Sequence, residues 1–273
     1  MSQRFIATKE HRRFTEFADT VRRGHTIGLC FGPAGVGKTL SARRYAHWEK
    51  THDLITNWGP RSEDDAEIYA ALARSRTVLY TPSVLTTPRT LKDELNQAIT
   101  RTNICIEQHL APYGNVTPET RGWRRSGNYV ELIIVDESER LRPAALELLR
   151  DRYDRDEIAV ILIGMPGLEK QFSRYPQFYS RVGFAHQYRP LGQDELLFVL
   201  QRHWRSLGRT LDPEDFTDAQ ALATIARLTR GNFRLLERLF PQVERILKIN
   251  ELETITNDVI EAAASTLVVG VTS

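Results

Sequence analysis

The sequence predicts an α/β protein in which a parallel sheet lies between helices and a small all-helical part follows. Two observations lead to this fold class. Short apolar runs alternate with helical patterns through the first 190 residues, and only helical patterns remain after Pro190. Such alternation is typical of parallel sheets that are covered on both faces. We therefore expect an α/β nucleotide-binding domain at 1–190 and a helical domain at 191–273.

The individual elements follow from apolar periodicity and from the turn residues that interrupt it. The expected strands are the apolar runs 26–31, 76–81, 131–137, 158–164 and 184–190. The expected helices are 9–22, 38–50, 88–110, the segment "PAALELLRDRYD" and four segments after Pro190. The stretches 53–75 and 111–130 interrupt the pattern, so we expect loops there.

Composition narrows the class of protein. The chain has 273 residues, of which 41% are hydrophobic and 26% charged, so it has enough apolar residues for an ordered core. Residues 1–50 hold ten Lys and Arg against four Asp and Glu, which suits either a polyanionic partner or a solvated helix face. Cys30 and Cys105 have no metal-ligand spacing. Every apolar run is too short to cross a bilayer, so we expect a cytoplasmic protein without a membrane partner.

The strongest motif is "GPAGVGKT", which follows an apolar strand and opens a helix. In this context the pattern predicts a phosphate-binding loop, whose backbone N–H groups and helix dipole attract phosphate. Lys38 is expected to neutralise the β and γ phosphates, and the Thr39 hydroxyl to bind Mg²⁺. The residues that we expect to bind the nucleotide are Gly32, Pro33, Ala34, Gly35, Val36, Gly37, Lys38, Thr39 and Leu40.

A second motif, "LIIVDE", carries two carboxylates at the end of a buried strand. Asp136 is expected to lie beside the phosphate loop, where it would bind the nucleotide's Mg²⁺. Glu137 follows directly and is expected to polarise the attacking water. Together the two motifs predict an ATPase that depends on Mg²⁺, with ATP and Mg²⁺ as cofactors.

With these motifs, "DESERL", "AVILIG" and the helical carboxyl-terminal part resemble the AAA+ ATPases over nearly the whole chain. Within that superfamily, "LIGMPGLEKQFSRYPQFYSRVGFAHQYRPL" and "GNFRLLERL" look most like the transposition ATPases of the TniB, TnsC and MuB group. The resemblance implies a AAA+ core with a helical lid. It also implies a regulator that oligomerises as a ring or helical filament on double-stranded DNA. Its implied partners are a transposase and, in addition, a target-selection protein.

The resemblance also implies two roles for arginine side chains. Arg181 matches the arginine that reaches the γ-phosphate held by a neighbouring subunit. Arg174 is the competing candidate for this role. Alternatively, Arg181 is a surface arginine that lies over aromatic residues. Arg234 matches the arginine that AAA+ lids present to the nucleotide, or belongs to a solvated helical stripe. The usual polar residue at the end of the fourth strand is missing at Gly164 and Met165. We therefore expect slow hydrolysis, stimulated by DNA.

The resemblance to this group points to DNA contacts in the segment after the second expected strand, where basic residues stand near a helix start. A glycine-bearing loop with several arginines is a second candidate, since Lys, Arg and helix-terminal N–H groups contact phosphates. The candidates are Arg89, Thr90, Lys92, Arg121, Arg124 and Arg125. Two other functions stay open. A helicase loader or replication initiator would add a sequence-specific DNA domain, for which we expect no room after about residue 265. A secretion-associated ATPase would carry a membrane or peptidoglycan-binding segment, which we do not find in the sequence.

Overall fold

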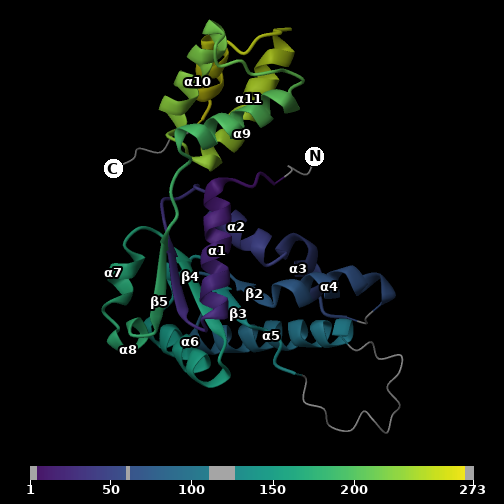
Figure 1. Ribbon diagram of the computed structural model, residues 1–273, viewed down its shortest axis with the longest axis vertical. Helices are drawn as coiled ribbons and strands as arrows, with labels where there is room; N and C mark the ends of the chain where they lie inside the picture. The colour runs from purple at the N-terminus through teal and green to yellow at the C-terminus, as the bar shows by residue number, and fades with distance from the viewer. Residues whose placement is uncertain (1–4, 60–61, 111–126, 268–273) are drawn as a thin grey trace. The chain divides into compact units, whose positions relative to one another are not determined.

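The computed structural model describes residues 5–59, 62–110 and 127–267 (Figure 1). The chain folds into two compact units. The first, here called the α/β unit, comprises Phe14–Gly32 and Lys38–Gln187. The second, the helical unit, comprises Pro33–Gly37, Tyr188–Ser273 and the described part of Met1–Arg13.

A five-stranded parallel sheet with the order β2-β3-β4-β1-β5 forms the centre of the α/β unit. Since neighbouring strands are far apart in sequence, helical crossovers connect them, as parallel pairing requires. The predicted α/β fold class is confirmed. The strands are β1 (Ile27–Phe31), β2 (Thr77–Tyr80), β3 (Leu132–Val135), β4 (Ala159–Gly164) and β5 (Val182–Gln187).

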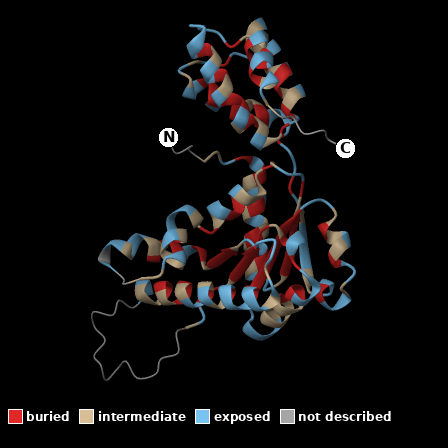
Figure 2. Ribbon diagram, turned by 180° about the vertical axis from the view of Figure 1, so that it is seen from behind, coloured by how far each residue is buried: buried red, intermediate tan, exposed pale blue. Residues whose placement is uncertain are grey.

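Alternate residues of the three central strands form the main core. Leu29 of β1 and Val135 of β3 are both opposite Leu162 of β4, so the three side chains lie in one row on one face. This face packs against Leu95 of α5 (Pro88–Leu110) and Phe172 of α7 (Leu168–Phe172) in a cluster of buried apolar residues. Figure 2 shows these strands as the most buried part of the unit. The core thus fixes the carboxyl ends of β1, β3 and β4 next to one another.

The opposite face of the sheet is covered by α1 (Lys9–Arg23), whose residues from Phe14 onward belong to the α/β unit. A Cβ atom on Gly28 would lie 2.6 Å from Val21 Cγ2 and 2.8 Å from Phe17 Cζ. Glycine is therefore needed at this point of β1, because any side chain would push α1 away from the sheet.

Most expected elements are present, with three differences. The expected helix 38–50 is broken at His47, which adopts φ 52° and ψ 31°. No glycine or proline stands at the break, so the sequence carries no stop signal there. The stretch 53–75, expected as a loop, contains the end of one helix and a further helix that packs Tyr69 and Leu72 on α5. β5 begins at Val182 rather than at residue 184.

The other helices of the α/β unit lie between α1 and Tyr188, the residue at which the chain returns to the helical unit. They are α2 (Lys38–Tyr45), α3 (Trp48–Thr56), α4 (Ala66–Ser75), α5 (Pro88–Leu110), α6 (Pro143–Asp156), α7 (Leu168–Phe172) and α8 (Pro176–Tyr179). Among the described residues of the unit, short 3-10 helices also occur at η1 (Glu63–Asp65) and η3 (Ser138–Arg140).

The helical unit contains α9 (Gln193–Ser206), α10 (Phe216–Thr229), α11 (Phe233–Ile249) and α12 (Asn257–Ser265). Its core contains a cluster of buried apolar side chains, among them Trp204 and Phe240, whose ring centroids lie 5.7 Å apart. Three of these helices begin at a capping residue, as the polar residues before each apolar run would predict. These are Asp215, Asn232 and Thr256.

Candidate nucleotide-binding site

The glycine-rich loop joins the end of β1 to the start of α2 at Lys38. Gly35 and Gly37 adopt φ 81° and 108°, a left-handed region that glycine enters without strain. Within the α/β unit, the Gly32 N–H donates to the carbonyl of Gly164 at the end of β4 (3.3 Å). The loop thus starts where β1 and β4 end, the edge of a parallel sheet at which ligands bind.

Lys38, Thr39 and Asp136 make the contacts expected of a nucleotide and metal site. The Lys38 ammonium donates to the Gly32 carbonyl at 2.5 Å. The Thr39 hydroxyl donates to Asp136 Oδ2 at 2.6 Å, although the two residues are 97 positions apart. Asp136 is only 4% exposed. A hydroxyl and a carboxylate side by side form the hard oxygen donor set that Mg²⁺ prefers, so these residues fit the ion.

Glu137, the expected catalytic base, has an unusual backbone conformation. It adopts φ 49° and ψ 42°, a left-handed conformation that costs a non-glycine residue about 1–2 kcal/mol. Such conformations cluster at functional sites, where the surrounding structure enforces them. Its carboxylate forms an ion pair with Arg140, which in turn donates to the Pro82 carbonyl at 2.9 Å. Glu137 is therefore held beside Asp136 with its carboxylate already engaged.

The end of β4 holds a carboxylate to which the sequence alone gave no role. A Cβ atom on Gly164 would lie 2.6 Å from Glu139 Oε2, so the exposed Glu139 fills the space of the missing side chain. Ser138, which is fully buried, donates to the Ile163 carbonyl at 2.9 Å and so ties η3 to β4. The Glu139 carboxylate thus lies at the end of β4, where AAA+ proteins usually have a polar residue. In the sequence, the only sign of this role was that Glu139 follows Asp136 by three residues in "DESE".

In the helical unit, the loop residues Pro33–Gly37 contact the start of α11. Asn232 Nδ2 donates to the Ala34 carbonyl at 2.9 Å, and the Arg234 backbone N–H donates to the Gly35 carbonyl at 2.9 Å. The Arg234 side chain is exposed and, among the described residues, has no hydrogen-bond or ion-pair partner. Asn232 was missed, although an asparagine before an apolar run signals a helix cap.

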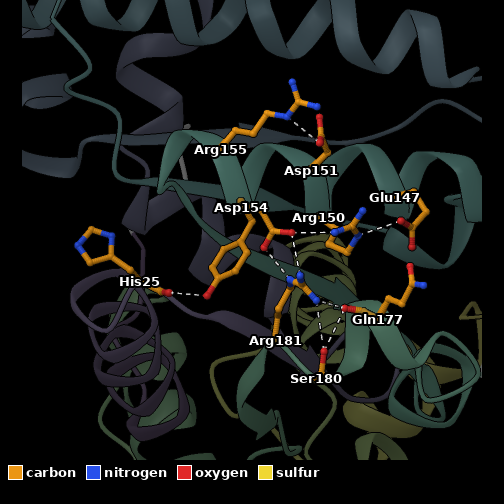
Figure 3. A network of polar contacts seen from close by, with 10 residues as sticks. His25, Glu147, Arg150, Asp151, Asp154, Arg155, Gln177, Ser180 and Arg181 are labelled. Atoms are coloured by element: carbon orange, nitrogen blue, oxygen red, sulfur yellow. Dashed lines mark hydrogen bonds and ion pairs between the residues drawn. The ribbon is translucent and has the colours of Figure 1, made fainter.

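Arg181, the expected finger, lies directly before β5 and is engaged within its own chain (Figure 3). Its Nε and Nη2 atoms donate to the two Asp154 carboxylate oxygens at 2.6 and 2.9 Å. Its Nη1 atom donates to the Gln177 carbonyl (2.5 Å) and to Ser180 Oγ (3.3 Å). This bonding to Arg181 lowers the pKa of Asp154. The competitor Arg174 is exposed and has no such partner among the residues that the structure describes.

The expected DNA contacts fall into two groups. Arg89, Thr90 and Lys92 lie on the exposed first turn of α5, and 94% of the Arg89 side chain is exposed. Thr90 also helps to begin the helix, because its N–H donates to Thr87 Oγ1 at 3.1 Å. The second group, Arg121, Arg124 and Arg125, lies outside the described residues.

A strand that ends in a glycine loop, with a carboxylate at the end of another strand of the same sheet bonded to the hydroxyl after the lysine, is the arrangement of P-loop nucleoside triphosphatases. This chain has that fold. The profile of the AAA domain family matches residues 21–172, more than half of the chain. The protein therefore belongs to this family and is a AAA+ ATPase with a nucleotide-binding site. The expected resemblance to AAA+ proteins is confirmed, whereas membership of the TniB, TnsC and MuB group stays a prediction.

Comparison with known proteins supports this assignment. The chain is 40% identical to a "Potential ATP-binding protein" of Staphylococcus aureus over 276 residues, which covers 99% of this chain and 98% of the relative. The Thermotoga maritima RuvB Holliday junction branch migration motor has a similar fold (TM-score 0.56, 19% identity, 95% of this chain and 69% of that chain). So does Aeropyrum pernix ORC1, solved in complex with DNA (TM-score 0.52, 18% identity, 95% and 65%).

The described residues also bear on membranes and on metals. No helix among them is long and apolar enough to cross a membrane. No group of three or more His, Cys, Asp or Glu side chains in those residues could hold a metal ion by itself. Thr39 and Asp136 offer two oxygen ligands, and a nucleotide's phosphates offer further ones.

Proposed function

We propose that this protein is a Mg²⁺-dependent ATPase that oligomerises on double-stranded DNA and recruits or activates a transposase. ATP hydrolysis then controls disassembly. The 2.6 Å hydrogen bond between Thr39 and Asp136 carries the enzymatic part, because it joins the two motifs expected to hold the nucleotide's metal. The transposition part rests on the resemblance of the segment around Arg181 and of "GNFRLLERL" to the TniB, TnsC and MuB group.

Each site residue has a proposed task. Lys38, whose ammonium now rests on the Gly32 carbonyl, transfers its hydrogen bonds to the β and γ phosphates. Thr39 and Asp136 hold Mg²⁺, which neutralises phosphate charge when it is bound. Glu137 orients the attacking water and accepts its proton at a carboxylate oxygen. It must first leave its ion pair with Arg140, which fits an enzyme that turns over slowly.

Arg181 is proposed to act on the nucleotide of a neighbouring subunit. Its guanidinium is always charged and planar, which suits stabilisation of the charge that develops during phosphoryl transfer. It precedes β5, an edge strand on which Phe184 is 41% exposed, and it follows Tyr179, which is 42% exposed. Exposed aromatic residues on an edge strand and on the short helix before it support contact with another subunit.

Double-stranded DNA is the proposed assembly platform. Arg89 and Lys92 lie exposed at the start of α5, where the positive end of the helix dipole adds to their charge, and both features favour phosphate. The fold likeness to RuvB and to DNA-bound ORC1 is compatible with this role. We further propose that the protein works in the cytoplasm as two domains, 1–190 and 191–273. A target-selection protein is a further proposed partner.

ATP binding tests the enzymatic part. We expect Lys38→Ala to abolish binding of a fluorescent ATP analogue, because the lysine supplies the positive charge at the phosphates. Lys50→Ala is the matched control, because Lys50 pairs with Glu67 on the exposed surface and has no part in the site. Unchanged ATP affinity in Lys38→Ala would contradict the site.

Electron microscopy tests the assembly. Rings or filaments should form on duplex DNA with a non-hydrolysable ATP analogue at low salt, and they should be lost at high salt, because phosphate contacts release counterions. A chain that stays monomeric under these conditions would refute the DNA-dependent assembly. A reading frame for an integrase-type transposase next to the gene would separate this function from a helicase loader or a secretion-associated ATPase.

A further inference from the structure

The start of α11 donates hydrogen bonds to the backbone carbonyl groups of the phosphate loop. Two hydrogen bonds of 2.9 Å join them, one from Asn232 Nδ2 to the Ala34 carbonyl and one from the Arg234 N–H to the Gly35 carbonyl. All these residues belong to the helical unit. We infer that Asn232 is a positioning residue that orients the loop for phosphate without touching the nucleotide.

The planarity of the peptide bond gives these two contacts their consequence. In a trans peptide, the carbonyl of one residue and the N–H of the next residue point in opposite directions. Because the Ala34 and Gly35 carbonyls are directed at α11, the N–H groups of Gly35 and Val36 point away from that helix. These N–H groups lie in the loop that P-loop proteins turn toward phosphate. Asn232 therefore fixes the orientation of phosphate donors from the far side of the loop.

The side chain of Asn232 has two separate tasks, for which its amide group supplies one acceptor atom and one donor atom. Its Oδ1 atom accepts the Leu235 N–H at 3.3 Å and so caps α11, while its Nδ2 atom donates to the loop. Aspartate caps a helix as well as asparagine does, but an ionised carboxylate has no donor. The contact is also close, since a Cβ atom on Gly35 would lie 2.5 Å from Asn232 Oδ1.

This arrangement links the helical unit to nucleotide affinity. The loop continues from Val36 and Gly37 into Lys38 and Thr39, so the orientation of its peptides affects every phosphate contact that follows. Any displacement of α11 acts on the Ala34 and Gly35 peptides through these two bonds. The inference rests on the proposed binding of ATP to this loop, and its test must separate the two.

Asn232→Asp is the deciding variant. It keeps the cap of α11, removes the donor to the loop and places a carboxylate against the Ala34 carbonyl. We expect ATP and ADP to bind about tenfold more weakly, the size of one lost hydrogen bond. In steady state, KM should rise by the same factor while kcat changes less than about twofold, because the bond serves substrate and transition state alike.

Asp215→Ala is the control for helix capping, because Asp215 caps α10 through two backbone N–H groups and has no part in the loop. It should lower the melting temperature yet leave the ATP affinity unchanged, whereas Asn232→Ala should lower both. Equal ATP affinity in Asn232→Asp and the wild type would overturn the inference and leave the ATP site intact. A wild-type chain that binds ATP no better than Lys38→Ala would instead overturn the proposed nucleotide function.

Discussion

His203 makes the helical unit sensitive to acid. Its ring, on α9, is stacked on Phe240 of α11 with centroids 4.0 Å apart and an interplanar angle of 5°. Glu237 Oε1 lies 3.6 Å from Nε2 and favours the charged ring, but His203 is only 8% exposed. Desolvation by burial outweighs the carboxylate and lowers the pKa of His203 from 6.5 to about 4. The folded chain therefore prefers the neutral ring.

The sign of the pH effect follows from this shift. The unfolded chain binds a proton near pH 6.5 and the folded chain only near pH 4, so acid favours unfolding. The contribution of His203 to stability is complete above pH 6.5 and is lost as the pH falls toward the folded pKa. With these two pKa values, the loss between pH 7 and pH 5 is about 2 kcal/mol.

Urea unfolding at pH 7 and pH 5 measures this loss. The comparison is between the wild type and His203→Phe, which keeps a flat ring against Phe240 but cannot titrate. We expect the wild type to lose about 2 kcal/mol more than the variant on acidification. His109→Gln, a change at an exposed position near the end of α5, should behave like the wild type. Equal acid sensitivity in His203→Phe and the wild type would refute the reasoning.

Four further tests address the site. Gly35→Ala should lower the free energy of unfolding by about 1–2 kcal/mol and weaken ATP binding, because φ is 81° there; thermal melting and nucleotide titration measure both. Glu139→Gln should slow ATP turnover by about tenfold or more with unchanged ATP affinity, and Glu137→Gln should bind ATP and hardly hydrolyse it. A mixture of Arg181→Ala with Lys38→Ala subunits should recover ATPase activity, since each supplies what the other lacks.

Each of these has its own control or counter-result. Gly59→Ala should be neutral, because a Cβ atom there would meet nothing within 4 Å. Wild-type turnover in Glu137→Gln or in Glu139→Gln would remove that residue from its role. Absence of ATPase activity at every mixing ratio would count against a finger that acts between subunits.

Local sequence patterns predicted those loops, strands and helices whose structure is determined by residues close together in the sequence. The loop Gly32–Thr39 and the strand before Asp136 follow from short motifs, and the bounds of α5 agree with the prediction because Pro88 starts the helix. The break at His47 was missed because its left-handed backbone carries no glycine or proline signal.

Contacts between residues that are far apart in the sequence could not be predicted from such local patterns. The pairing of Arg181 with Asp154, 27 positions away, depends on how α6 and β5 pack, and both residues by themselves look like surface charges. The same holds for Asn232 and Ala34, which are 198 positions apart. A capping signal identifies Asn232 as a helix start, but only the folded chain brings its amide to the loop.

The bonding of Arg181 has a kinetic consequence. Four of its five N–H groups donate to acceptors of its own chain, so a neighbouring phosphate must compete for a guanidinium that is already satisfied. In dilute solution, the Arg181 side chain of a single subunit then stays bonded within its own chain. Under the proposed function, the ATPase rate per subunit should rise with protein concentration, with an apparent reaction order above one. The rate of ATP hydrolysis would then depend on how many subunits have assembled.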